Sequence, residues 1–275
     1  MKFLILAHRW DTSAAAVAAL LQRRHGAAEV RLVALEELLY APSWAHRLED
    51  QRVTTEVRLH DGTVICSDDT GVVLQRLRPF TMPHFDSQDR AYAAAEMSAL
   101  LLSWLAGFAC PVLNPVAPRS FCFGRSPVRW LALASEAGLP LPRLRLTSNL
   151  RRFSADGLAS ADASLTPMQL LLAGRSPAFL AEPSGHQTHS VRSVLLAGKH
   201  VVGDLPSELL PACRAFTARA VTPVLRINFS VDDKHSRWTF VDADALPMLN
   251  AVETLAVVDL MESLVDERIT AVVIP

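Results

Sequence analysis

Lysine, cysteine and glycine are all scarce in this chain, and the patterns of glycine and cysteine each argue against a class of function. Only three lysines occur among the 275 residues, at Lys2, Lys199 and Lys234. The 11 glycines form neither a P-loop nor a dinucleotide-binding glycine fingerprint. The four cysteines contain no Cys-x-x-Cys pair, which argues against a zinc site and a disulfide framework. We therefore expect a cytoplasmic protein with reduced thiols.

A strong net charge and long apolar runs are also missing. The formal net charge is -1, with acidic and basic residues interspersed, so no footprint for a nucleic acid is present. No segment approaches the run of about 18 apolar residues that a membrane-spanning helix needs. The apolar run at the N-terminus is too short for a signal peptide. We expect neither a nucleic acid nor a membrane among the partners.

The first part of the chain has the pattern of an α/β domain. An apolar run at 2–7, a helical pattern at 13–24 and a second apolar run at 29–34 predict a β–α–β unit, whose crossover is almost always right-handed. The alternating segments at 54–59 and 63–66 flank Asp61-Gly62, which is typical of a β-hairpin. A strand at 71–77, a helix at 89–107 and a short strand at 111–114 complete the pattern. We predict an open, mainly parallel sheet domain over residues 1–118.

The second half is expected to contain an antiparallel sheet with helices packed on it. Between the two halves, residues 119–189 form a central region with a helix at 127–137 and a short helix near Met168–Ala173. Residues 190–275 form the C-terminal part, with strands expected at 190–197, 201–202, 224–231 and 238–242, and helices at 208–219 and 252–267.

Four segments, in a fixed order, resemble the ATP-grasp superfamily. They are MKFLILAHRWDTSAAAVAALLQRR, then VLNPVAPRSF with VRWLALASEAGLPLPRLRLTSN, then VRSVLLAGKHVVGD, and finally FVDADALPML. The branch they resemble includes RimK-like carboxylate–amine ligases and ribosomal-peptide macrocyclases. The resemblance implies a preATP-grasp domain with an open parallel sheet, followed by a shortened ATP-grasp-like α+β domain. It also implies a reaction in which ATP phosphorylates a carboxylate and an amine attacks the acyl phosphate.

The resemblance places a magnesium site near the end of the chain. The family ends a strand with an acid, a spacer and an asparagine, which match Asp242, Ala243 and Asp244 here. Strand alternation puts residues 242 and 244 on one face. Asn228 matches a further acid of the family and offers an amide oxygen. These oxygen ligands suit Mg²⁺, although an Asp-Ala-Asp sequence also occurs where a strand simply ends.

Arginines match the family positions that handle phosphate and substrate. Arg192 matches the arginine that contacts the transferred phosphate, so it is the expected catalytic residue; the alternative is a solvated strand arginine. Arg76 and Arg78 resemble a pair that ends a strand of the first domain and faces the central cleft. A surface salt bridge is the alternative for this pair.

Three departures from the family pattern concern the nucleotide. No lysine occurs in the stretch 123–127, where the family has one; Arg125 or Arg129 would have to replace it, with different geometry. Glu182 stands where the family has a lysine before proline, and a carboxylate beside a triphosphate repels it by about 1–4 kcal/mol. The segment from about 148 to 190, which should cover the nucleotide, is expected to be abbreviated.

These departures favour a truncated, degenerate ATP-grasp protein that binds ATP and Mg²⁺ weakly or not at all. It would be an accessory or substrate-binding component of a peptide-tailoring or small-molecule pathway, beside a full-length ATP-grasp ligase or a peptide substrate. The first alternative is an active ATP- and Mg²⁺-dependent carboxylate–amine ligase. The second is a dimeric scaffold, and a homodimer is expected.

Overall fold

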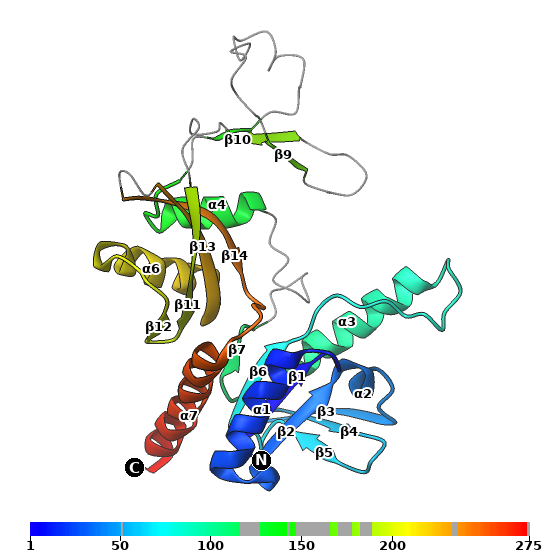
Figure 1. Cartoon of the computed structure of the whole chain (residues 1–275). Helices are drawn as coiled ribbons and strands as arrows, with labels where there is room; N and C mark the ends of the chain where they lie inside the picture. Colours follow the sequence, from blue (N-terminus) through cyan, green and yellow to red (C-terminus); the bar gives the residue numbers. More distant parts are fainter. Residues whose placement is uncertain are drawn as a thin grey trace.

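The structure is a computed structural model. It describes residues 1–50, 52–115, 127–141, 144–146, 166–169, 178–181, 189–232 and 236–273. The chain forms two main parts, drawn in Figure 1 as a blue and cyan part and a yellow and orange part, with α7 (Ala251–Val273) running beside α1 (Thr12–His25).

The first part is built on a parallel sheet, as predicted. Its strands are β1 (Phe3–Ala7), β2 (Val30–Ala34), β6 (Val72–Arg76) and β7 (Val112–Leu113), in the order β2-β1-β6-β7. Between β1 and β2, α1 begins at Asp11, whose carboxylate accepts a hydrogen bond from the Ala14 backbone N–H at 2.9 Å. The helix ends at Gly26, whose φ of 88° suits glycine.

A small antiparallel sheet covers the second face of the first part. It consists of β3 (Ser43–Glu49), β4 (Arg52–Arg58) and β5 (Val64–Cys66), in that spatial order. The β4–β5 hairpin was predicted; β3 and the short helix α2 (Leu35–Leu39) were not. The C-terminal turns of α3 (Arg90–Ala106) bring Trp104 into this core.

The central region contributes α4 (Pro127–Glu136) and a three-stranded antiparallel sheet in the order β8-β10-β9. The strands are β8 (Leu144–Leu146), β9 (Thr166–Gln169) and β10 (Ala178–Ala181). The short helix expected from Met168 is wrong at its start, because Met168 pairs with Phe179 across β9 and β10. Residues 170–173 lie outside the described residues. Cross-strand pairing here overrides a local preference for helix.

The C-terminal part is the predicted antiparallel sheet, in the order β12-β11-β13-β14. Its strands are β11 (His189–Ala197), β12 (His200–Val202), β13 (Val224–Asp232) and β14 (Arg237–Asp244). After the 3₁₀ turn η2 (Ser207–Leu209), helix α6 (Leu210–Ala220) packs with α4 on one face of the sheet. On the other face, Leu195 and Ala197 pack into the core that includes α1 and α7. Among the described helices, none is long and apolar enough to cross a membrane.

Candidate functional site

Three polar side chains lie side by side on one face of the C-terminal sheet. Ser193 of β11 is opposite Asn228 of β13, and Asn228 is opposite Asp242 of β14. The Ser193 hydroxyl donates to the Asn228 amide oxygen at 2.6 Å, and the Asn228 amide donates to Asp242 Oδ1 at 2.5 Å. We call Ser193, Asn228 and Asp242 the polar row. Asp244 lies on the same face, two residues further along β14.

A β-bulge in β14 gives the polar row its direction. Phe229 pairs with Phe240, but the preceding residue Asn228 pairs with Asp242, so Val241 is an extra residue. Phe240 therefore points into the core under α4 and α6, whereas Asp242 points away from it. In a regular strand these two residues would share a face. Bulges re-aim side chains in this way near functional sites.

Asp244 lies next to an ion pair that joins the sheet to the start of α7. It is opposite Arg226 in the β13–β14 register, and its Oδ1 accepts a hydrogen bond from the Leu246 N–H at 2.8 Å. Arg226 binds both carboxylate oxygens of Glu253 at 2.7 and 2.8 Å and the Met248 carbonyl at 2.6 Å. The segment that follows β14, which we call the β14 exit, is therefore held on the same face of the sheet as the polar row.

The first part of the chain holds this exit in place. Arg76, at the end of β6, binds the two oxygens of Asp11 at 2.8 and 3.3 Å and the Pro247 carbonyl at 3.0 Å. Arg78 donates to the Leu246 carbonyl at 3.2 Å. The Ser13 hydroxyl accepts from the Leu249 N–H at 2.8 Å. The polar row thus stands at the junction of the two sheets.

Asn114 joins the same two parts through the backbone of β13 and the residue after β14. Its amide donates to the carbonyls of Val224 and Ala245, both at 2.8 Å, and its amide oxygen accepts from the Val224 N–H at 3.0 Å. The side chain is buried, and its φ of 55° is in the left-handed region. Asparagine tolerates this conformation better than most residues.

The arginines predicted to handle phosphate do not gather at the polar row. Arg192 pairs with Phe229, so strand alternation directs it to the face covered by α6, opposite to Asn228 and Asp242. Arg129 is exposed on α4, which packs with α6 on that same face of the C-terminal sheet. Strand geometry therefore separates Arg192 from the acids with which it was expected to act. Arg125 and Glu182 lie outside the described residues.

Arg76 and Arg78, the pair predicted to face the central cleft, bind groups of this chain. Arg76 is 2% exposed and engaged with Asp11 and Pro247, so its guanidinium is a structural clamp instead of an open anion site. Arg78 is exposed and makes one bond from its guanidinium to the neighbouring loop. Buried arginine–carboxylate pairs of this kind join segments that are distant in sequence.

Sequence reasoning missed four residues of this junction: Ser193, Arg226, Glu253 and Asn114. A local signal existed for Glu253, since the segment Asn250-x-x-Glu253 has the spacing of a helix-capping box. The Glu253 N–H donates to the Asn250 side chain at 3.0 Å, and Glu253 accepts from the Asn250 N–H at 2.8 Å. The partners of the other three lie far away in the sequence.

The polar face fits a hard divalent cation with few protein ligands. Asp242, Asp244 and Asn228 offer three side chains with oxygen atoms, and both aspartates are exposed. Such a set suits Mg²⁺, which keeps several water ligands and takes one or two carboxylates from the protein. Over the described residues, no cluster of three or more His, Cys, Asp or Glu side chains could hold a metal. A cation held by Asp242 and Asp244 would therefore take its remaining ligands from water and phosphate oxygens, because Asn228 turns its amide nitrogen toward Asp242 and its amide oxygen toward Ser193.

Solved structures with this architecture settle the fold. A ligase associated with ribosomal peptide modification in Chryseobacterium gregarium, solved with ADP and with leader and core peptides, matches with a TM-score of 0.72. The match has 14% identity and covers 97% of each chain. The chain has the ATP-grasp fold.

Two further ATP-grasp structures agree over nearly the whole chain. The macrocyclase MdnC of Microcystis aeruginosa, bound to its precursor peptide MdnA, has a TM-score of 0.72 and 12% identity, with 96% of this chain and 100% of that chain covered. The ligase PsnB, solved with Mg, ADP and a variant of a minimal precursor, has a TM-score of 0.70, 18% identity and coverages of 96% and 98%. No family model and no curated protein matches the sequence. The predicted fold is thus confirmed.

Proposed function

We propose that this chain is an ATP-grasp-type component of a peptide-tailoring pathway, which binds a peptide or a partner ligase and holds Mg²⁺·ATP weakly. The observation that carries the proposal is the polar face at the junction of the two sheets. Ser193, Asn228, Asp242 and Asp244 carry side-chain oxygen atoms on one face of the C-terminal sheet, beside the segment after β14 that the first part binds. The peptide side of the proposal is supported by the similar proteins, which were solved with precursor peptides.

Weak nucleotide binding is supported by the positions of the cationic side chains among the described residues. Of the described lysines, Lys2 precedes β1, and Lys199 lies in the turn between β11 and β12; neither is on the polar face. Charge builds up on a phosphoryl group during transfer, and cations are the groups that stabilise it. Arg226, the nearest arginine in the β-sheet register, is engaged with Glu253. The polar face is therefore richer in metal ligands than in phosphate-binding cations.

Calorimetric titration with ATP in the presence of MgCl₂ tests the nucleotide part. We expect a dissociation constant weaker than about 1 mM, which is near -4 kcal/mol. The double variant Asp242→Asn, Asp244→Asn should remove the residual signal, while Asp69→Asn, an exposed acid in the β5–β6 loop, should leave it unchanged. A micromolar constant for the unaltered protein would overturn the weak-site proposal and favour an active ligase.

The active ATP-dependent carboxylate–amine ligase is the second candidate, favoured by the two aspartates that share the open face. The effect of Asp242→Ala on product formation in the producing cell separates the two. An accessory protein would tolerate the change, whereas a ligase would lose its product with the fold intact. As a companion, Glu182→Lys should strengthen ATP binding, because it replaces a repulsive charge by an attractive one. If ATP binding does not become stronger, Glu182 does not lie at the phosphate-binding position.

A further inference from the structure

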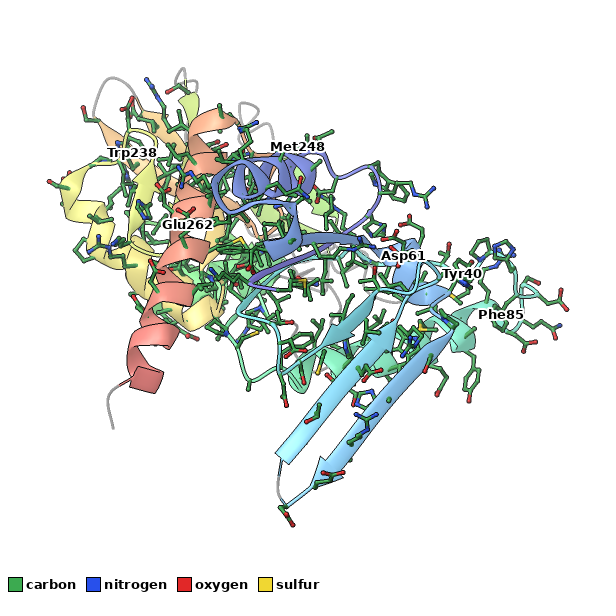
Figure 2. The ribbon with its side chains drawn as sticks, turned by 90° about the horizontal axis from the view of Figure 1, so that it is seen from below. Tyr40, Asp61, Phe85, Trp238, Met248 and Glu262 are labelled. Atoms are coloured by element: carbon green, nitrogen blue, oxygen red, sulfur yellow. The ribbon has the colours of Figure 1, made fainter. Side chains whose placement is uncertain are left out.

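Arg226 of β13 places one nitrogen atom among three oxygen atoms beside the β14 exit. Its Nη2 donates to both carboxylate oxygens of Glu253, at 2.7 and 2.8 Å, and to the Met248 carbonyl at 2.6 Å. Met248 belongs to the β14 exit and is labelled near the start of α7 in Figure 2. We call the Glu253 carboxylate and the Met248 carbonyl the oxygen cage.

The contact does not use the planar fork of the guanidinium group. A fork binds a carboxylate through two nitrogens, as Arg76 binds the two oxygens of Asp11 through Nε and Nη2. The Nε atom of Arg226 is buried, and among the described residues no atom accepts a hydrogen bond from it. Arg226 therefore acts on the oxygen cage as a compact positive charge, a role that an ammonium group or a metal ion also performs.

The oxygen cage requires a positive charge because it is largely shielded from water. The side chains of Arg226 and Glu253 are 20% and 8% exposed, so water contributes little to the solvation of either charge. Glu253 also accepts a hydrogen bond from the Asn250 N–H at 2.8 Å, at the start of α7. Removal of the cation would leave a buried carboxylate without a counter-charge at this helix end.

A short segment connects the oxygen cage to Asp244 of the polar face. Arg226 lies opposite Asp244 in the β13–β14 register. Asp244 Oδ1 accepts a hydrogen bond from the Leu246 N–H, and Leu246 precedes Met248 by two residues. By holding the Met248 carbonyl, Arg226 therefore restrains the end of the strand from which the Asp244 carboxylate projects.

We propose that Arg226 is the resident cation of the oxygen cage, and that in this role it positions Asp244 for a divalent cation on the polar face. The second half of this statement rests on the proposed function, whereas the first half does not. Arg226 is a positioning residue, since it acts through the β14 exit. Two consequences follow: the cage should accept another cation when the guanidinium is removed, and an ammonium group should replace the guanidinium.

Chemical rescue tests the resident cation. Arg226→Ala should lower the midpoint of thermal unfolding, and methylguanidinium at millimolar concentration should recover part of the loss by binding in the emptied cage. Adding Glu253→Gln to Arg226→Ala should abolish this recovery, because the cage then carries no charge. If Arg226→Ala does not fold by itself, recovery of folded protein on refolding with methylguanidinium gives the same answer.

Arg24→Ala is the control for the rescue. Arg24 also binds two carboxylates through one nitrogen, those of Asp259 and Glu262, but its side chain is 35% exposed. Water therefore solvates these carboxylates when the arginine is removed. Methylguanidinium should leave the midpoint of this variant unchanged. Equal recovery in Arg24→Ala and Arg226→Ala, or no recovery in Arg226→Ala, would overturn the proposal.

Lysine substitution separates a compact charge from a fork. Arg226→Lys should keep most of the stability, because an ammonium group has three donors for the three oxygens. Arg76→Lys should lose much more, because the Asp11 carboxylate and the Pro247 carbonyl are bound by the two ends of a fork. If Arg226→Lys were as unstable as Arg226→Ala, the guanidinium would be needed for its shape and the proposal would be wrong.

Binding of Mn²⁺, followed by electron paramagnetic resonance, tests the positioning of Asp244. The double variant Arg226→Ala, Glu253→Gln, whose cage cannot hold Mn²⁺ itself, should bind Mn²⁺ about 10–100-fold more weakly than the unaltered protein. Arg226→Lys should bind it as the unaltered protein does. Equal Mn²⁺ affinity of the folded double variant would overturn the positioning role. An unaltered protein that binds no Mn²⁺ would instead overturn the metal site of the proposed function, and the methylguanidinium rescue would still decide the resident cation.

Discussion

At the scale of the residue, Arg76 and Asp11 form a buried ion pair beside the segment that follows β14. Their side chains are 2% and 9% exposed, and Asp11 also caps α1 through the Ala14 N–H. A charge left unpaired in such a place is costly because water no longer solvates it. The sequence pattern indicated a strand end with two arginines, but the partner of Arg76 lies 65 residues earlier in the chain.

Arg76→Ala should therefore lower the free energy of unfolding by about 3–5 kcal/mol, measured by urea denaturation. Arg47→Ala is the control, since the Arg47–Glu56 pair is 3.8 Å apart and Arg47 is largely exposed. That change should cost less than about 1 kcal/mol. If Arg76→Ala unfolded like the unaltered protein but lost ligand affinity, the cleft role expected from the sequence would be right.

Cys213 gives a second prediction at this scale. Burial in the core under α6 raises the pKa of its thiol from 9.0 to about 12. The unfolded thiol ionises near its ordinary value while the folded thiol keeps its proton, so stability should fall as the pH rises above about 9. Cys213→Ala should weaken this pH dependence in thermal melts. If stability fell equally steeply with pH in both proteins, the raised pKa of Cys213 would be contradicted.

In the native state, iodoacetamide should react with the partly exposed Cys66 well before Cys213.

At the scale of the element, β7 and β13 are joined by one side chain. Asn114 satisfies the N–H and the carbonyl of Val224 and the carbonyl of Ala245, the last of which follows β14. Three backbone groups of the C-terminal sheet thus depend on a residue of the first part. The sequence contained Asn114 in the segment VLNPV, but its three partners become visible only once the strands are placed.

Asn114→Ala should destabilise the protein by at least about 2 kcal/mol, because buried backbone groups lose their partners. Asn114→Gly is the matched variant, since glycine adopts a φ of 55° without strain. The difference between the two variants in thermal or urea unfolding isolates the backbone cost from the loss of the side-chain hydrogen bonds. If Asn114→Gly were as stable as the unaltered protein, the hydrogen bonds would not hold the two parts together.

At the scale of the whole molecule, the polar row depends on both sheets. The loop after β14 is bound by Ser13, Arg76 and Arg78, all of the first part. A ligand that binds at this junction should therefore stabilise the entire fold by mass action. With Mg²⁺·ATP at ten times a dissociation constant of about 1 mM, the gain is about 1.4 kcal/mol.

A thermal-shift series over ATP concentration, at constant excess MgCl₂, measures this gain. The midpoint should rise slowly and without saturation below the millimolar range. The double variant Asp242→Asn, Asp244→Asn should show no rise, because it removes the carboxylates that are proposed to hold the cation. A steep rise at micromolar ATP would point to a tight site and to the ligase candidate.

The order of most elements, and the shared face of Asp242 and Asp244, follow from the sequence alone. Apolar runs, helical spacing and alternation are local patterns, so they predict β1, α1, β2, the β4–β5 hairpin and the four C-terminal strands. They also place residues 242 and 244 on one side, because side chains alternate along any strand.

Only the tertiary structure decided which side that is and what stands beside it. The bulge at Val241 arises from the pairing of β14 with β13, and it turns Asp242 away from Phe240. The same pairings put Arg192 on the opposite face, Arg76 against Asp11, and Met168 in a strand. Each of these outcomes depends on contacts between segments far apart in the chain, and a local sequence pattern carries no record of such contacts.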